Sequence, residues 1–68
     1  MALTEQLKRR AERRVELRER LVASGCEPPS GIALNAVLAR CQDVDLAFTA
    51  LTMQPRPAWV RHIVTDLS

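Results

Sequence analysis

Aromatic residues are scarce in this chain of 68 residues, which has no tyrosine and only Phe48 and Trp59 as aromatic side chains. Sheet cores favour aromatic and β-branched residues, whereas leucine and alanine favour helices. Leucine, valine and alanine supply most of the apolar mass here. We therefore expect an all-α fold whose core is made by helices packing on helices.

Cysteine and histidine are equally few. Cys26 and Cys41 are the only cysteines and His62 is the only histidine. Small secreted domains held by disulfides usually carry about four to eight cysteines. None of the three residues is paired with another at the short spacing of a zinc site. We expect reduced thiols, no disulfide framework and no metal.

Motifs of catalysis and nucleotide binding are missing. The chain contains neither G-x-G-x-x-G nor a P-loop. A Cys41–His62 pair would lack a third group to orient it. A chain this short also leaves little polypeptide to enclose a substrate pocket. We expect a protein that is not an enzyme and needs no cofactor.

Long hydrophobic runs are absent too. No stretch approaches the roughly 18 uninterrupted apolar residues of a membrane span. The first ten residues, MALTEQLKRR, lack the apolar centre of a signal peptide. Together with the free thiols, this predicts a cytoplasmic protein that does not engage a membrane.

The first predicted helix covers residues 4–23, with Thr4 as its N-cap and Gly25 just beyond its end. At about 100° per residue, one apolar sector collects Leu3, Leu7, Ala11, Val15 and Val22, with Leu17 and Leu21 on its flank. An isolated helix cannot bury such a sector. It must pack on the rest of the chain, on a second copy or on a partner.

Pro28 and Pro29 end this first segment, and Ser30 offers an N-cap for a helical stretch over residues 31–53. One apolar line along this stretch consists of Val37, Cys41, Val44, Phe48 and Leu51. A second, less bulky line collects Ile32, Ala36, Ala39, Leu46, Ala47 and Ala50. A helix that is apolar on two sides is either central and mostly buried or shared between two chains.

Two features of the second half leave alternatives open. Asp43 can cap a new helix that begins at Val44, so residues 31–53 form one helix or two, and we favour a break at Gln42–Asp43. Pro57 begins a final predicted helix over residues 57–67. The β-branched residues within 59–65 leave a strand as the alternative. The whole chain, 1–68, is then a single domain of three helices, or of four if the central stretch breaks.

Positive charge is concentrated in the first predicted helix. Residues 1–25 carry Lys8 and six arginines against four glutamates, a net charge of +3, while residues 26–68 carry −1. The arginine row predicts a surface for an acidic partner, because guanidinium groups pair well with carboxylates. The alternatives are a solvated charged face and long stems that lie along apolar surface. The predicted partner-binding residues are Arg9, Arg10, Arg13, Arg14, Arg18 and Arg20.

The apolar residues of the central and final segments predict a core and a dimer contact. We expect a homodimer, because the central stretch has more apolar surface than the two other helices can cover. Trp59 either anchors the last helix on the central one or serves as an exposed contact for a partner. The residues assigned to the core or the dimer contact are Val37, Cys41, Val44, Phe48, Leu51, Trp59 and Ile63.

These features favour a small regulator that binds an acidic surface of another protein and modulates or inhibits it. Phage- and plasmid-encoded inhibitors and anti-activators fit this size and composition by analogy. A DNA- or RNA-binding regulator is the alternative, although the glutamates of residues 1–25 would repel phosphates and residues 44–53 contain no basic residue. A subunit that is stable only within a larger assembly is the third hypothesis.

Overall fold

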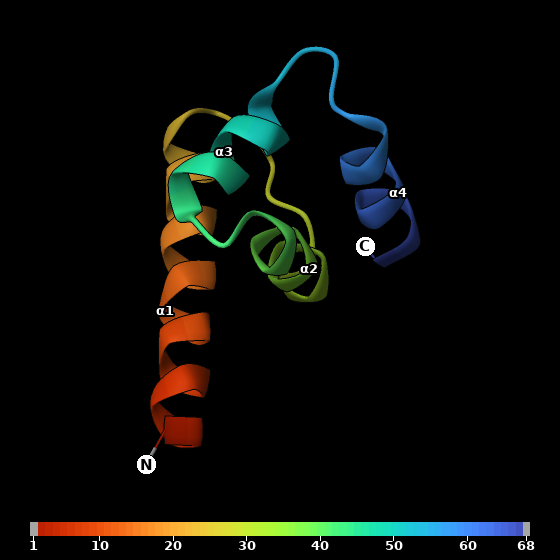
Figure 1. Ribbon diagram of the computed structural model, residues 1–68. Coiled ribbons are helices and arrows are strands. Elements are labelled where there is room, and N and C mark those ends of the chain that lie inside the picture. The colour runs from red at the N-terminus through yellow and green to blue at the C-terminus, as the bar shows by residue number, and fades with distance from the viewer. Residues whose placement is uncertain (1, 68) are drawn as a thin grey trace.

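The computed structural model describes residues 2–67, with side chains described from Thr4 onward. These residues form four helices and no strand: α1 (Ala2–Ala23), α2 (Gly31–Cys41), α3 (Val44–Thr52) and α4 (Ala58–Leu67), as Figure 1 shows. The all-α prediction is confirmed, in its four-helix form. The strand alternative for residues 59–65 is wrong, because these residues lie within α4.

Helix α2 lies at the centre of the arrangement, since it packs against α1, α3 and α4. Helix α1 also packs against α3. The N-terminal half of α1 extends beyond the other three helices (Figure 1). This projection gives the molecule its elongated shape of 40 × 24 × 18 Å.

The end of α1 is closed by a Schellman motif. Gly25 has a φ of 85°, a conformation that glycine adopts without steric penalty. The amide of Gly25 donates to the carbonyl of Val22, and the amide of Cys26 donates to that of Leu21 at 2.8 Å. At the other end, the N-cap prediction for Thr4 is wrong, because the helix already begins at Ala2.

The central stretch divides at the corner between α2 and α3. Ser30 caps α2, its hydroxyl accepting a hydrogen bond from the amide of Ala33. Gln42 ends α2 in the left-handed conformation, with its amide bonded to the carbonyl of Leu38. The carboxylate of Asp43 then accepts a hydrogen bond from the amide of Asp45, so Asp43 is the N-cap of α3. The local cap signal at Asp43 therefore outweighs the continuous apolar pattern.

The turn between α3 and α4 is held by one arginine. The Nε atom of Arg56 donates to the carbonyl of Leu51 at 2.9 Å, which satisfies one of the free carbonyls at the end of α3. Pro57 accepts hydrogen bonds from the amides of Val60 and Arg61. Helix α4 therefore begins at Ala58, one residue later than predicted, with Pro57 just before it.

Helix α1 buries the flank of its apolar sector and leaves the centre exposed. Leu17 and Leu21 are fully buried, whereas Leu7, Val15 and Val22 remain exposed. The flank carries the two leucines, which bury more surface than valines, and α2 and α3 pack against it. Of the three partners considered for this sector, the rest of the chain covers only its flank.

The second half of the chain supplies the rest of the core. Val37 and Leu51 are fully buried, whereas Cys41, Val44 and Phe48 are half-buried against them. Although the corner at Gln42 separates α2 from α3, all five residues of the predicted apolar line lie in this core or against it. The second line is divided instead: Ala47 and Ala50 are buried, but Ile32 and Leu46 are exposed.

Candidate functional site

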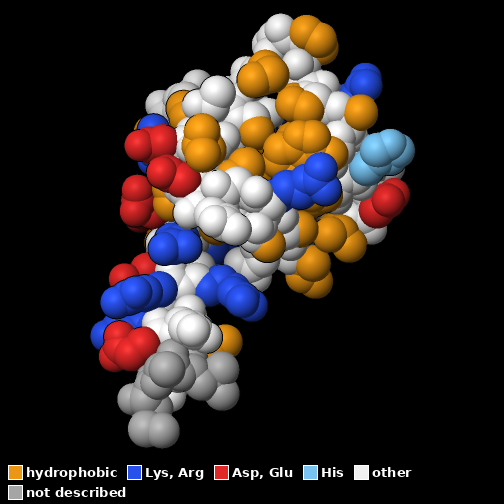
Figure 2. Space-filling view, viewed as in Figure 1, with side chains coloured by type: hydrophobic (Ala, Val, Ile, Leu, Met, Phe, Trp, Pro, Cys, Tyr) orange, Lys and Arg blue, Asp and Glu red, His pale blue; other side chains and the backbone are white. Residues whose placement is uncertain are grey.

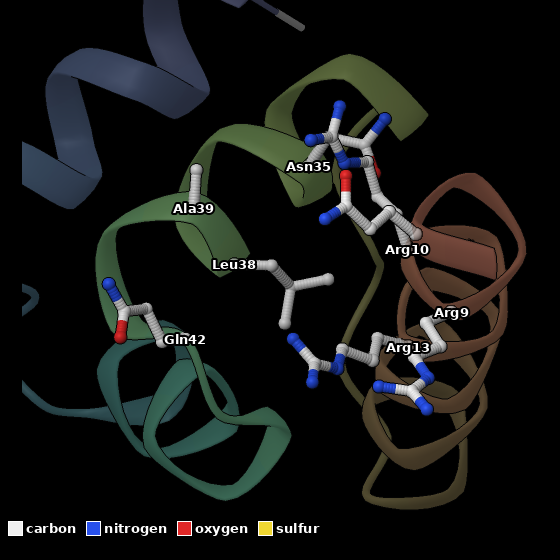
Figure 3. Close-up of a pocket in the computed structure, with 8 residues that line it drawn as sticks. Arg9, Arg10, Arg13, Asn35, Leu38, Ala39 and Gln42 are labelled. Carbon is white, nitrogen blue, oxygen red and sulfur yellow. The ribbon is translucent and has the colours of Figure 1, made fainter. Parts of the chain in front are cut away.

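A cavity of about 300 Å³ lies between the projecting part of α1 and the second half of α2. We call it the arginine cleft. In Figure 3 the arginine side chains of α1 project toward the space in front of α2, and Leu38 points toward them. The cleft is lined by Gln6, Arg9, Arg10, Arg13, Asn35, Leu38, Ala39 and Gln42.

Helical spacing brings these side chains together. In an α-helix, residues at i, i+3, i+4 and i+7 share one face. Residues 6, 9, 10 and 13 have this spacing in α1, and residues 35, 38, 39 and 42 have it in α2. One face of each helix therefore forms one wall. Three of the four residues that form the α1 wall are arginines, whereas the residues of the α2 wall are uncharged.

The electrostatics of the arginine cleft are one-sided. No carboxylate is among its lining residues, while three guanidinium groups are. The glutamates of α1, Glu5, Glu12, Glu16 and Glu19, are all exposed and do not line the cleft. Figure 2 shows basic and acidic side chains intermixed along the projecting helix, and apolar side chains over much of the rest of that face. The cleft is thus a local concentration of positive charge.

Asn35 adds a polar group with no internal partner. Its Oδ1 atom is buried and has no hydrogen-bond partner among the described residues. A buried polar atom without a partner typically costs about 1–3 kcal/mol. Gln6 and Gln42 bring two more amides to the cleft. The site therefore combines charged donors with amide groups that can both donate and accept.

Arg14 and Arg18 lie apart from the cleft, at the start of α2. A Cβ atom on Gly31 would lie 3.6 Å from the Cδ atom of Arg14 and 3.8 Å from Nη2 of Arg18. The Nε atom of Arg14 is buried without a partner among residues 4–67. The stem of Arg14 and the guanidinium of Arg18 thus lie beside Gly31, where α1 meets α2.

Arg20 is engaged within the chain. Its Nη1 atom forms an ion pair with Oδ1 of Asp45 in α3, and its guanidinium lies over the Phe48 ring, 4.7 Å from the ring centre. The predicted arginine set is thus divided among three places. Arg9, Arg10 and Arg13 line the cleft, Arg14 and Arg18 border Gly31, and Arg20 joins α1 to α3.

Trp59 lies half-buried against the core, between α4 and α2. The guanidinium of Arg40 in α2 lies over its ring, 5.0 Å from the centre. Ile63 is half-buried beside it in α4. Trp59 therefore packs on the core while part of its ring stays exposed, an arrangement compatible with both roles considered for it.

Cys26 and Cys41 are both free and half-buried. Burial raises the pKa of the Cys41 thiol above its ordinary value; Arg40 opposes this effect and Asp43 adds to it. The thiol therefore stays protonated and behaves as a small apolar side chain. Within residues 2–67, no three histidine, cysteine or carboxylate side chains are grouped so as to hold a metal ion.

Sequence reasoning identified the arginines of the cleft but not its amides or its α2 wall. Asn35 and Gln42 are seven residues apart on α2, a spacing that marks a shared face. That face became part of a site only because α1 crosses it, and the sequence carries no signal for this crossing.

None of the described helices is long and apolar enough to cross a membrane. No protein-family model, curated protein or solved structure matches this chain.

Proposed function

We propose that this chain is a non-enzymatic regulator that binds an acidic segment of another protein in the arginine cleft and thereby modulates or inhibits that protein. One observation carries the proposal. Arg9, Arg10 and Arg13 line one cavity in which no carboxylate takes part. Guanidinium groups form paired hydrogen bonds with carboxylates, which makes clustered Asp and Glu side chains the matching ligand.

The size of the cleft favours a short segment. A cavity of about 300 Å³ is at the lower end of ligand sites and has room for a few side chains. The half-buried Asn35 and the exposed Gln42 offer amides to the main chain of such a segment. Leu38 and Ala39 supply an apolar contact between the charged groups.

A nucleic-acid regulator remains the second candidate function, supported by the same arginines. Phosphates also accept paired hydrogen bonds from arginine. The glutamates of α1 weigh against it, because a phosphate backbone that follows the helix would pass Glu5 and Glu12. Helix α3 contains no basic residue to enter a groove. We therefore place the acidic protein segment first.

Peptide binding tests the proposal directly. A fluorescent hexaglutamate peptide should bind the chain with a polarisation change that salt weakens. The double variant Arg9→Gln/Arg13→Gln should lose most of this binding, roughly tenfold or more, because each charged hydrogen bond contributes about 1.5–3 kcal/mol. Lys8→Gln/Arg61→Gln removes the same charge from exposed positions outside the cleft and should bind nearly as the parent does.

Two results would contradict the proposal. Equal losses in the two double variants would mean that net charge, and not the cleft, attracts the peptide. Tighter binding of a single-stranded oligonucleotide than of hexaglutamate, with a steep dependence on salt concentration, would favour the nucleic-acid regulator. A chain that is unfolded when purified would instead support the subunit of a larger assembly.

We also propose that the chain acts as a homodimer and presents two clefts to its partner. Several large apolar side chains support this proposal because they stay exposed on the single chain: Leu7, Val15, Val22, Ile32, Leu46, Met53 and Leu67. Two linked clefts would strengthen binding to a partner that carries repeated acidic segments.

A further inference from the structure

We infer that part of α1 becomes a stable helix only when an acidic segment occupies the arginine cleft. This part, residues 4–13, carries Arg9, Arg10 and Arg13 and forms the α1 wall of the cleft. We call it the α1 arm. The inference rests on the proposed function, because it concerns the same site and the same ligand. It adds the regulation of that site, since the ligand orders one wall of the cleft that binds it.

The α1 arm has no part in the core. Every side chain from residue 4 to residue 13 is exposed except Ala11, which is half-buried. The buried side chains of α1 are Leu17 and Leu21, which both lie beyond the arm. Figure 1 shows the arm projecting past the other three helices. Because tertiary packing supplies most of the stability of helices in proteins, the arm must form largely on its own.

Polar contacts do not hold the α1 arm either. Among the described residues, no side-chain hydrogen bond or ion pair joins residues 4–13 to α2, α3 or α4. The arginine cleft lies where the arm would otherwise pack on α2. The later half of α1, by contrast, is held by the ion pair of Arg20 with Asp45 and by the turn at Gly25. Local stability therefore falls along α1 toward its N-terminal end.

Like charges on the cleft face lower the stability of the α1 arm further. Arg9 and Arg13 are four residues apart, and Arg10 and Arg13 are three apart, so these arginines are neighbours on the helix surface and repel one another. On the outer face, Lys8 and Glu12 form a favourable pair. The arm also extends a helix that is already formed, so it needs no new nucleus. It can therefore open and close from its free end while the rest of α1 stays folded.

An acidic segment in the cleft changes this balance. Its carboxylates replace the repulsion among Arg9, Arg10 and Arg13 with paired hydrogen bonds. Those bonds need the three guanidinium groups on one face, which exists only while the arm is helical. A ligand that binds only the helical form stabilises that form by mass action. Occupation of the cleft and order in the α1 arm are therefore coupled.

This coupling lowers the affinity of the free chain for its ligand. The apparent dissociation constant rises in proportion as the fraction of binding-competent chains falls. If the arm is helical in about a third of the free chains, the ligand binds about threefold more weakly than it would bind a fixed arm. A change that fixes the arm should therefore tighten binding, even where it alters no residue of the cleft.

Hydrogen exchange of the full chain measures the coupling residue by residue, at a protein concentration low enough to avoid self-association. In the free chain, the amides of residues 8–13 should be protected less than about tenfold, and those of residues 17–22 far more. Saturating hexaglutamate should raise the protection of residues 8–13 by about tenfold or more. Polarisation of the labelled peptide in the same samples reports whether the cleft is filled.

A covalent link tests the coupling without altering the cleft. Lys8 and Glu12 are exposed, lie four residues apart and do not line the cleft. A lactam bridge between their side chains holds this turn helical. The bridged chain, made by chemical synthesis, should bind hexaglutamate about threefold more tightly than its control. The control is Lys8→Gln/Glu12→Gln, which has the same net charge but no link.

Glycine tests the opposite change. Leu7→Gly weakens the helix within the α1 arm but removes no residue of the cleft, so it should lower the affinity for hexaglutamate about threefold. Its matched control is Leu46→Gly in α3, because the two leucines are 55% and 57% exposed. That variant should bind the peptide as the parent does. Circular dichroism checks that both variants remain helical.

Each of three results overturns the inference and leaves the proposed function intact. Equal protection along the whole of α1 in the free chain would show that the arm is stable without a ligand. Hexaglutamate binding without a rise in arm protection would show that occupation does not order the arm. Equal affinities of the bridged chain and its glutamine control would show that order in the arm does not limit binding. A parent chain that does not bind hexaglutamate at all overturns the inference and the proposed function together.

Discussion

The hydroxyl of Ser30 joins two helices that are far apart in the sequence. It accepts a hydrogen bond from the amide of Ala33 and donates one to the carbonyl of Leu67, 2.6 Å away. One side chain thus caps the start of α2 and satisfies a free carbonyl at the end of α4. The two contacts use different parts of the hydroxyl, which a carboxylate cannot do because it carries no proton to donate.

We predict that Ser30→Ala lowers the free energy of unfolding by about 1–3 kcal/mol, the combined effect of a lost cap and a lost hydrogen bond. Ser30→Asp should retain the cap but lose the bond to Leu67. Urea denaturation compares the stabilities. Hydrogen exchange should be faster in α4 of both variants, whereas the start of α2 should lose protection only in Ser30→Ala. Slow exchange throughout α4 in Ser30→Asp would show that the Leu67 bond contributes little.

Arg20 is expected to stabilise the chain more through Phe48 than through Asp45. The side chain of Asp45 is 78% exposed, so solvent and salt screen the ion pair, which should contribute less than about 1 kcal/mol. Arg20→Ala also loses the contact with the Phe48 ring and should therefore destabilise more than Asp45→Ala. A double-mutant cycle by thermal unfolding at low and high salt checks both statements. A coupling that salt does not reduce would contradict the screening argument.

Replacing Leu17 and replacing Val15 by alanine should have very different effects on stability, although both are apolar residues of α1. Leu17 is fully buried, so Leu17→Ala should cost about 2–5 kcal/mol. The free energy of unfolding of a chain of this length is roughly 3–10 kcal/mol. The Leu17→Ala variant should therefore be largely unfolded at 37 °C. Val15→Ala should leave the dilute monomer nearly unchanged. Thermal unfolding at low protein concentration measures both, and equal effects would contradict the assignment of the packing face.

Because the pKa of the Cys41 thiol is raised, we predict that the stability of the chain changes at alkaline pH. Its pKa is raised in the folded chain above the ordinary value of 9.0, chiefly by burial. The unfolded thiol therefore ionises first, so this contribution to stability is present below pH 9.0 and is lost as the pH rises through the folded pKa. Urea unfolding of the parent and of Cys41→Ala across this range should show a steeper decline in the parent. Parallel curves would contradict the prediction.

We expect that Asn35 lowers the stability of the free chain and strengthens its binding to hexaglutamate. Its Oδ1 atom is buried without a partner in the described part of the chain, so Asn35→Leu should stabilise the free chain by about 1 kcal/mol or more. The same variant should bind hexaglutamate more weakly, because it removes an amide from the arginine cleft. Unfolding and polarisation measurements on one preparation check both effects. A variant that binds as the parent does would remove Asn35 from the site.

Much of the local structure follows directly from short-range signals in the sequence. Ser30 and Asp43 are good N-cap residues, and Gly25 suits the left-handed end of α1. These preferences act within a few residues, so they can be recognised without knowledge of the fold. The all-α class follows in the same way from a composition with few aromatic residues. Thr4 is the exception, because α1 begins two residues earlier.

Tertiary packing decided which faces are used. The periodicity of α1 located an apolar sector, yet only the position of α2 and α3 determined that Leu17 and Leu21 are buried and that Val15 and Val22 remain exposed. The arginines were similarly visible in the sequence, but the crossing of α1 over α2 placed Arg13 in a cleft, and the packing of α1 on α3 placed Arg20 in an ion pair. Hydrophobic burial depends on area and has no preferred direction. A helix with several apolar edges therefore does not specify from its own sequence which edge its neighbours will cover.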